Sequence, residues 1–543
     1  MRMLIYILVI LVASFACFEC QGGSLKGPVR NALTLDELEQ TAKVIFKGTV
    51  VSSEPVEDES IEDLSGYQPY ETIFNVISVF KGEIAEEKQM TFRHYSLQRN
   101  PSFSNTMPQS YNFEVGKHYF VCANAAAENQ DTPRVVRQIN WDRQVAKQDQ
   151  GVLASTNNQP HRGKLLSEIY WNELTDAINS PQPASQVYAI TQLNKMSSTS
   201  FDGHQSFKRD KVVDVIANSI QSEDDSVATA AMKLVGAQNY GGGIYELIRL
   251  NPKHFQGHNS SVVLAKPSRS AQSCSEKLIA MANSTRSSKL RSVAIKALLN
   301  SANPKLYPLA TKWSQDDSEL VRAAAAILLA DYSQQVTLEQ WKQLMDDSSA
   351  EVRKRAVRGI GVGQIEELLD EVESKLDDEE PSVAGFAVAT MMSFPIEKTR
   401  SKFQKHVKHP EYGCLFVNVL AAENPEDYLE ELGQVIRTDP HPKGWWGGRV
   451  PWGVSWELLF KYAQQHRGNI DDVLDSLESP VRDFEGSNHF SSSQPRDLYA
   501  LYVQRGMRRA KSYRKAVNEK TSYDMEYYFK QVDERPDSYL HGN

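Results

Sequence analysis

One hydrophobic pattern recurs along the middle of the chain every 31 residues. Five residues stand at this interval, namely Leu290, Val321, Val352, Val383 and Cys414. A fixed period of this length is the signature of a repeat architecture, in which each unit buries its apolar face only against its neighbours. The chain is therefore expected to build this region by stacking similar units.

Two further columns keep the same register. Four residues later stand Ala294, Ala325, Ala356, Ala387 and then Asn418, and eight residues later stand Leu298, Leu329, Ile360, Met391 and Ala422. Apolar residues at i, i+4 and i+8 form one buried stripe on a helix, and a small residue in that stripe lets a partner helix approach closely. Amphipathic segments such as 337–345 and 364–376 supply the partner helices. The pattern predicts an all-α solenoid of antiparallel helix pairs over residues 205–440, with Cys414 in its core and Lys354 pointing outward.

Charged residues at the turns follow the same period. The aspartates are Asp316, Asp347 and Asp378, and the next helix carries Arg322 or Arg353 near its start. This "DDS-x-x-VR-x-x-A" pattern resembles HEAT-like repeats of the phycobilisome-lyase type. The resemblance implies that each aspartate caps the following helix and pairs with the arginine of a neighbouring unit. Because Ala384 and Leu415 replace the arginine in later units, the ladder is expected to end there. HEAT-like units are mostly scaffolds, so the resemblance does not predict lyase activity.

The N-terminus has the organisation of a secretory signal. Residues 1–16 combine a basic start, an apolar run and small residues before a cleavage point after Ala16. Cleavage would leave Cys17 first, so a lipid anchor at Cys17 is one alternative for the mature, exported protein. The apolar run from Leu4 to Phe18 is too short for a transmembrane span, and no later segment qualifies. We expect a periplasmic, cell-surface or extracellular protein.

Residues 17–150 are expected to form a small all-β domain. Segments 44–51, 72–80 and 118–123 are rich in β-branched and aromatic residues and are separated by turns, which predicts a small antiparallel barrel. The order "AKVIFKGTVVSSE", "YETIFNVISVFKGE" and "FEVGKHYFVCA" resembles the netrin-like domain of bacterial relatives of tissue inhibitors of metalloproteinases. That resemblance implies an OB-like barrel, a disulfide from Cys17 or Cys20 to Cys122, and a metalloprotease inhibitor acting through Cys17. A metal-binding or redox role for the Cys17–Cys20 pair is the other alternative.

The remaining segments frame the repeats. Residues 151–204 are polar with one amphipathic stretch and are expected to be a connector with helices. Residues 441–543 are expected to be a helical C-terminal cap and tail that begins with an aromatic cluster. The cluster either closes the end of the helical array or forms a carbohydrate-binding platform, and it consists of Trp445, Trp446, Trp452 and Trp456.

Composition excludes several functions. With 60 basic and 69 acidic side chains the net charge is -9, which does not favour a nucleic-acid partner. No nucleophile elbow, zinc-protease motif or phosphate loop occurs, so we predict no enzyme, no catalytic residue, no cofactor and no metal.

The predicted fold is a multidomain chain, in which a small OB-like barrel is followed by a HEAT-like solenoid. Its predicted function is an exported, non-catalytic scaffold that binds an unidentified protein. The alternatives are the metalloprotease inhibitor and the carbohydrate binder.

Overall fold

The computed structural model describes most of the chain after residue 32. The described residues are 33–57, 67–83, 88–97, 111–125, 135–138, 151–197, 206–236, 272–299, 301, 303–443, 451–466, 468–483, 493–520, 525–535 and 538. They fall into two compact units, which meet in sequence between Leu306 and Tyr307. We call described residues 33–306 the sheet unit and described residues 307–538 the helical unit. No described helix is long and apolar enough to cross a membrane.

The sheet unit contains a mixed sheet of six strands. They are β1 (Val44–Pro55), β2 (Tyr67–Lys81), β3 (Gln89–Leu97), β4 (His118–Ala125), β5 (Val135–Gln138) and β6 (Val152–Ser155). The hydrogen-bonded order is β1-β2-β3-β5-β4-β6, and β4 also pairs with β1, so the first five positions close into a cycle. The expected purely antiparallel arrangement is wrong at one place, because β3 and β5 pair in parallel. Strand β6 extends the sheet beyond residue 150, into the segment expected to be a connector.

One face of the sheet forms an aromatic core. Phe46, Phe74 and Phe92 are buried together with aliphatic residues of β1, β4 and β5. His94 lies in the same interior, where its Nε2 is 2.8 Å from Thr72 Oγ1. Burial lowers the pKa of His94 to about 4, so the ring is neutral at physiological pH. In the tautomer that carries its proton on Nδ1, His94 donates to the Tyr95 carbonyl, 3.3 Å away. Its Nε2 then accepts a hydrogen bond from the Thr72 hydroxyl.

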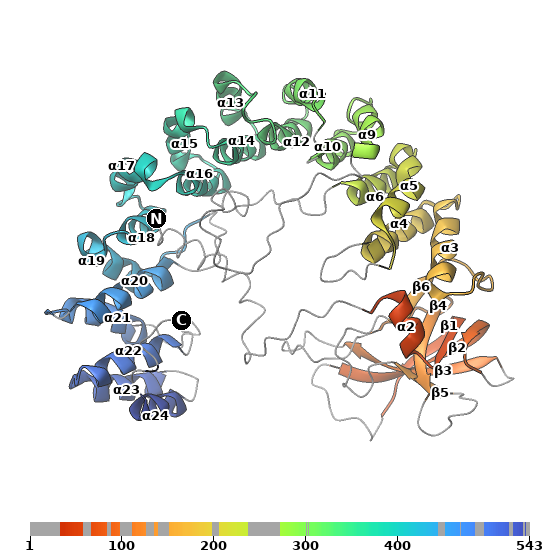
Figure 1. Ribbon diagram of the computed structural model, residues 1–543, viewed down its shortest axis with the longest axis horizontal. Helices are drawn as coiled ribbons and strands as arrows, with labels where there is room; N and C mark the ends of the chain where they lie inside the picture. The colour runs from red at the N-terminus through yellow and green to blue at the C-terminus, as the bar shows by residue number, and fades with distance from the viewer. Residues whose placement is uncertain are drawn as a thin grey trace. The chain divides into compact units, whose positions relative to one another are not determined.

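Helices precede and follow the strands within the sheet unit. They are α2 (Leu35–Thr41), α3 (Leu166–Ile178), α4 (Pro183–Ser197), α5 (Arg209–Ile216), α6 (Asp225–Val235), α9 (Ser275–Ala282) and α10 (Ser288–Ala297). Helix α3 packs on α2 and α4, and α4 packs on α6. The hydroxyls of Tyr170 and Tyr188 both donate to the carbonyl of Ala154 in β6. The segment after residue 150 is thus fixed to the sheet through β6 and its helices, as Figure 1 shows.

The helical unit is a succession of paired helices. They are α11 (Leu306–Trp313), α12 (Glu319–Ala330), α13 (Leu338–Met345), α14 (Ala350–Gly363), α15 (Leu369–Ser374), α16 (Pro381–Ser393), α17 (Ile396–His406), α18 (Gly413–Ala421), α19 (Leu429–Thr438), α20 (Pro451–Gln465), α21 (Asp471–Asp483), α22 (Ser493–Gln504), α23 (Arg509–Lys520) and α24 (Met525–Glu534). Helix α14 packs between α12 and α16. In Figure 1, α12, α14 and α16 form one row and α13, α15 and α17 form another.

The predicted helix phase agrees with the observed burial. The alanine column is fully buried at Ala294, Ala325, Ala356 and Ala387. The residues four before and four after these alanines are also buried in the same helices. In the fifth copy, Asn418 is buried and its Oδ1 accepts a hydrogen bond of 2.6 Å from Ser455 Oγ of α20. The polar residue in the column is therefore matched by a polar residue of α20.

Lys354 differs from its expected position. Its side chain is only 18% exposed and forms an ion pair with Glu351 one turn earlier in α14. The helix phase is right, but Lys354 is not a freely solvated residue. A long charged side chain can lie along its own helix and cover apolar surface while its ammonium meets a carboxylate.

Gly359 lets α13 and α14 pack closely, and this contact provides a prediction. A Cβ at Gly359 would lie 2.5 Å from Cη2 of the fully buried Trp341. We expect Gly359→Ala to lower the free energy of unfolding of the helical unit by about 1 to 3 kcal/mol through overpacking. Thermal melts of the full chain, followed by circular dichroism, measure this change.

The matched control is Gly453→Ala in α20, where an added Cβ meets no atom of the described residues within 4 Å. Alanine is the better helix former, so this change should leave stability unaltered or raise it by about 0.5 to 1 kcal/mol. Equal melting temperatures for the two variants would contradict the close contact between Gly359 and Trp341.

Candidate functional site at the junction of the sheet and the first helices

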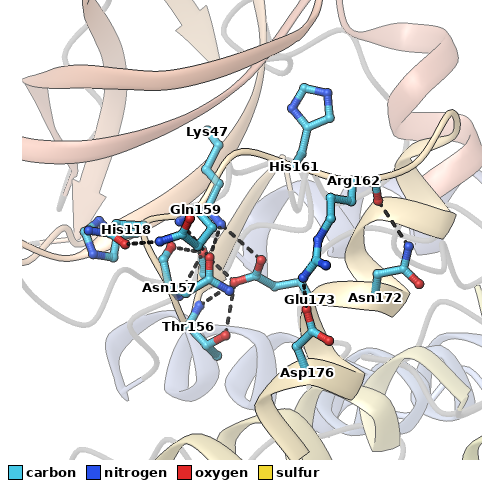
Figure 2. A network of polar contacts seen from close by, with 12 residues as sticks. Lys47, His118, Thr156, Asn157, Gln159, His161, Arg162, Asn172, Glu173 and Asp176 are labelled. Atoms are coloured by element: carbon cyan, nitrogen blue, oxygen red, sulfur yellow. Dashed lines mark hydrogen bonds and ion pairs between the residues drawn. The ribbon is translucent and has the colours of Figure 1, made fainter.

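Lys47 of β1 is a charged residue buried where the sheet meets the first helices. Its side chain has no exposed surface, and its Nζ donates to Glu173 Oε2 at 3.0 Å and to Asn157 Oδ1 at 2.9 Å. The ammonium also lies 5.1 Å from the centroid of the Phe120 ring. Strand β1 is covered on both faces near its start, which is why a side chain pointing away from the aromatic core is still buried. Figure 2 shows Lys47 reaching from the sheet to Glu173 of α3.

Glu173 uses both carboxylate oxygens. Its Oε2 accepts from Lys47, while its Oε1 accepts from Ser155 Oγ at 2.7 Å, from the Thr156 amide at 2.8 Å and from the Thr156 hydroxyl at 3.0 Å. Burial acts to raise the pKa of Glu173, but these hydrogen bonds and the charge of Lys47 together lower it below its usual value. Glu173 is therefore ionised at physiological pH.

For Lys47, burial has a larger effect on the pKa than the neighbouring charge has. Burial lowers the pKa of Lys47, and the neighbouring Glu173 carboxylate only partly offsets that effect. A lysine of lowered pKa is a recurrent feature of catalytic sites, but it is also found in structural ion pairs. Here the hydrogen bonds favour the structural role, because the ammonium is held by a carboxylate and an amide oxygen and has no exposed surface.

Two histidines flank this ion pair on the same face of the sheet. Lys47 lies opposite Ser78 on β2 and opposite Phe120 on β4, and His118 lies opposite Thr49, two residues further along β1. His118 Nδ1 is 2.9 Å from Thr49 Oγ1, and His161 Nδ1 is 2.9 Å from Ser78 Oγ. We call Lys47, Glu173, His118 and His161 the junction cluster.

Sequence reasoning missed the junction cluster, although two local signals were present. Lys47 interrupts the apolar run of a β-branched strand. Glu173 stands on the buried stripe of α3, seven residues after Leu166 and four after Ile169. A charged residue in an apolar strand and one in the apolar stripe of a nearby helix are candidates for a buried pair, since charges are rarely buried without a partner.

The predicted arginine residues contact the predicted aspartates in the helical unit. Arg322 donates to both carboxylate oxygens of Asp347, at 2.7 and 2.9 Å, and Arg353 does the same to Asp378, at 2.9 and 2.7 Å. Arg353 also donates to the carbonyls of Asp347 and Ser348 in its own turn, so it binds two successive turns together. The side chains of Arg353 and Asp378 are 9% and 6% exposed.

The aspartates lie two residues before the capping position predicted for them. Ser318, Ser349 and Glu380 are the residues that precede the three helices. The aspartate two residues earlier accepts the backbone N–H of that preceding residue, as the bonds from Ser318 to Asp316, Ser349 to Asp347 and Glu380 to Asp378 show. The aspartates therefore fix the turn before the helix rather than capping its first N–H groups.

The Arg353–Asp378 contact carries a stability prediction. We expect Arg353→Ala to lower the free energy of unfolding by about 1.5 to 3 kcal/mol, because charge-assisted hydrogen bonds are lost and Asp378 stays buried. Lys398→Ala is the control, since Lys398 pairs with Glu366 at 2.8 Å but both side chains are about half exposed. The control should have little effect, because solvent screens an exposed ion pair. Urea unfolding measures the free energy of unfolding of both variants. Similar losses in the two variants would contradict a ladder of Arg–Asp contacts that stabilises the repeats.

The other predicted site residues are placed only in part. Cys122 is buried in β4, whereas Cys17 and Cys20 lie outside the described residues, so the disulfide stays a prediction. Cys414 is half-buried rather than a full member of the core column. Burial nevertheless raises the pKa of its thiol to about 12, which disfavours the reactive thiolate.

The aromatic cluster is corrected at one residue. Trp456 is 3% exposed, stacks on Phe460 and donates its indole N–H to the Leu477 carbonyl at 3.1 Å. It belongs to the packing of α20 on α21 and cannot be part of an exposed platform. Trp445 and Trp446, and the side chain of Trp452, lie outside the described residues.

Comparison with known proteins gives little further information. No protein-family model and no curated protein matches the chain. Among solved structures, the chain is similar to an engineered protein known from a crystal structure, with 13% identity and a TM-score of 0.30 over 69% of this chain and 100% of that chain. At that TM-score the likeness bears on neither fold nor function.

Proposed function

We propose that the protein is an exported, non-catalytic scaffold that binds another protein through the surface of a HEAT-like solenoid at residues 205–440. The observation that carries the proposal is the repeated Arg–Asp contact between successive turns, Arg322 to Asp347 and Arg353 to Asp378, within helices that keep a 31-residue register. Such periodic packing is typical of HEAT-like solenoids, whose stacked helices offer an extended surface to a partner.

The proposal also covers the fold of the sheet. The cycle of pairings β1-β2-β3-β5-β4 and back to β1 supports a small OB-like barrel. The junction cluster supports a structural use of this barrel, because Lys47 and Glu173 are engaged with each other and with neighbouring polar groups. Export rests on the apolar N-terminal run and the small residues before Ala16.

Crosslinking of the full chain tests where the binding surface lies. The bait is the intact protein, mixed with an envelope extract of its source and treated with a lysine-reactive crosslinker. Exposed lysines report on both units: Lys43, Lys88 and Lys117 in the sheet unit, and Lys312, Lys398 and Lys405 in the helical unit. Reproducible crosslinks from the helical-unit lysines to one protein support the proposal.

The alternatives predict different outcomes. One outcome is that crosslinks come only from the sheet unit and lead to a metalloprotease whose activity falls on mixing. This result would contradict the scaffold proposal and favour an inhibitor acting through Cys17. Retention of the full chain on an envelope polysaccharide, with no crosslinked protein, would favour a carbohydrate binder. Turnover of any extract component by the purified chain would overturn the non-catalytic assignment.

A further inference from the structure

The junction cluster gathers three basic groups around one carboxylate. His118 and Lys47 lie on the same face of the sheet, because Thr49, which is opposite His118, is two residues from Lys47 in β1. His161 reaches the same place from the loop before α3, where its ring meets the edge of Phe80 with centroids 5.7 Å apart. Glu173 is the carboxylate that hydrogen-bonds to Lys47.

The other charged groups around the cluster are engaged elsewhere or add positive charge. Arg162 pairs with Asp176 at 2.6 Å, and Lys117 is exposed next to His118. Other charged groups of β2, α2 and the start of α3 have their own partners. Lys81 donates to the Glu39 carbonyl, Glu39 accepts from the Leu166 amide, and Glu168 accepts from the Lys164 amide. Glu71 pairs with Arg93, Glu37 accepts from the Thr34 amide, and Asp36 is the further acidic residue of α2.

We infer that the junction cluster is an acid-sensitive lock between the sheet and α3. When His118 and His161 are neutral, Lys47 and Glu173 form a balanced pair that holds α3 against the sheet. When both histidines take up protons, three cations lie around one carboxylate in a half-buried space, and repulsion among them favours release of α3. This inference is independent of the proposed binding function.

The direction of the pH dependence follows from the neighbours of each histidine. Burial lowers the pKa of His118, the charge of Lys47 lowers it further, Glu173 acts in the opposite direction, and Lys117 again lowers it. Burial and Lys47 likewise lower the pKa of His161. An opened junction has histidines of ordinary pKa, near 6.5, so it binds more protons than the closed one below that pH. The closed junction keeps its full stability above about pH 6.5 and loses it as the pH falls through the lowered values. Glu173, whose pKa is lowered, stays ionised in this range.

Hydrogen exchange of the full chain at pH 7.5 and pH 5.5 tests the lock. After correction for the intrinsic exchange rate, we expect opening of Leu166–Ile178 to increase severalfold at pH 5.5. The upper limit is about a hundredfold, since each of the two histidines contributes at most about tenfold over the one pH unit below 6.5. The double variant His118→Gln, His161→Gln should lose most of this increase. His441→Gln should retain it, because His441 is 64% exposed and lies in the helical unit.

A second histidine of the sheet unit must be separated from this effect. His94 is buried in the aromatic core with a pKa of about 4, and it also weakens the sheet in acid. Because His94 is unchanged in the double variant, the difference between that variant and the original chain reports on the junction cluster. Equal protection of α3 at both pH values in the original chain would overturn the inference, whether or not the variant folds. An unchanged increase in a folded double variant would overturn it as well.

Discussion

Lys47→Met is expected to lower the local stability of the junction by about 3 to 5 kcal/mol. Methionine matches the length of the lysine stem, so the packing against Phe120 is largely kept and the loss comes from the charge. Glu173 would remain 7% exposed, still accepting from Ser155 and Thr156 but without its cation. Removing one partner of a buried ion pair leaves an uncompensated charge, which is why the expected loss is large.

Native-state hydrogen exchange of β1 and α3 measures this loss, because a chain of two units need not unfold in one step. The matched control is Arg162→Met, which breaks the neighbouring Arg162–Asp176 pair. Those two side chains are 75% and 53% exposed, so the control should cost about 1 kcal/mol or less. Combining Lys47→Met with Glu173→Gln should recover part of the loss by removing the buried charge. Equal effects of Lys47→Met and Arg162→Met would show that the buried pair contributes no more than a surface pair.

The helix phase of the repeats could be read from the sequence because it depends on local periodicity. A buried stripe repeats at i, i+4 and i+8, and its register is fixed by residues such as Ala325 and Ala356, which the structure buries fully. The Arg322–Asp347 and Arg353–Asp378 contacts could also be anticipated, since the 31-residue period carries them along the chain. A repeat thus reveals contacts that are 25 residues apart in sequence.

The junction cluster could not be read in the same way because its members are far apart in sequence and occur once. Lys47 and Glu173 are 126 residues apart, and no periodic pattern links a strand position to a helix position. The predicted strands were those rich in β-branched and aromatic residues. Strand β3 was missed although it has nine residues, because polar and charged residues interrupt its apolar ones. The four-residue strands β5 and β6 were missed too, since runs this short take their structure from pairing with β4 rather than from their own sequence.

The role of the aspartates in the turns could not be predicted from the sequence, because it depends on the backbone geometry before the helix. The sequence places Asp347 two residues before Ser349 and six before Arg353, and both a cap and a turn contact are compatible with that spacing. The backbone of Ser349 is extended, and its N–H points to Asp347 rather than into the helix. The aspartate therefore serves the turn on one side and Arg322 of the preceding unit on the other.

Ala325→Glu is expected to destabilise the helical unit by several kcal/mol. Ala325 is fully buried in α12, and its neighbours Ala324 and Ala326 are fully buried too, so a longer side chain has no route to solvent along the helix. A carboxylate placed there is both too large and unpaired, and burying an unpaired charge costs several kcal/mol. That is a large fraction of the roughly 5 to 15 kcal/mol by which a domain is stable. Because α14 packs on α12, the loss should extend to the next repeat.

The control for this prediction lies in the same helix. Leu320 is 42% exposed in the first turn of α12, where a glutamate also meets the partial positive charge of the helix N-terminus. Leu320→Glu should therefore change stability by about 0.5 kcal/mol or less. Thermal melts of the full chain, with hydrogen exchange of α12 and α14 as the local measure, compare the two variants. If both melted at the same temperature, the alanine column would not face a packed helix, and the 31-residue register would lose its physical basis.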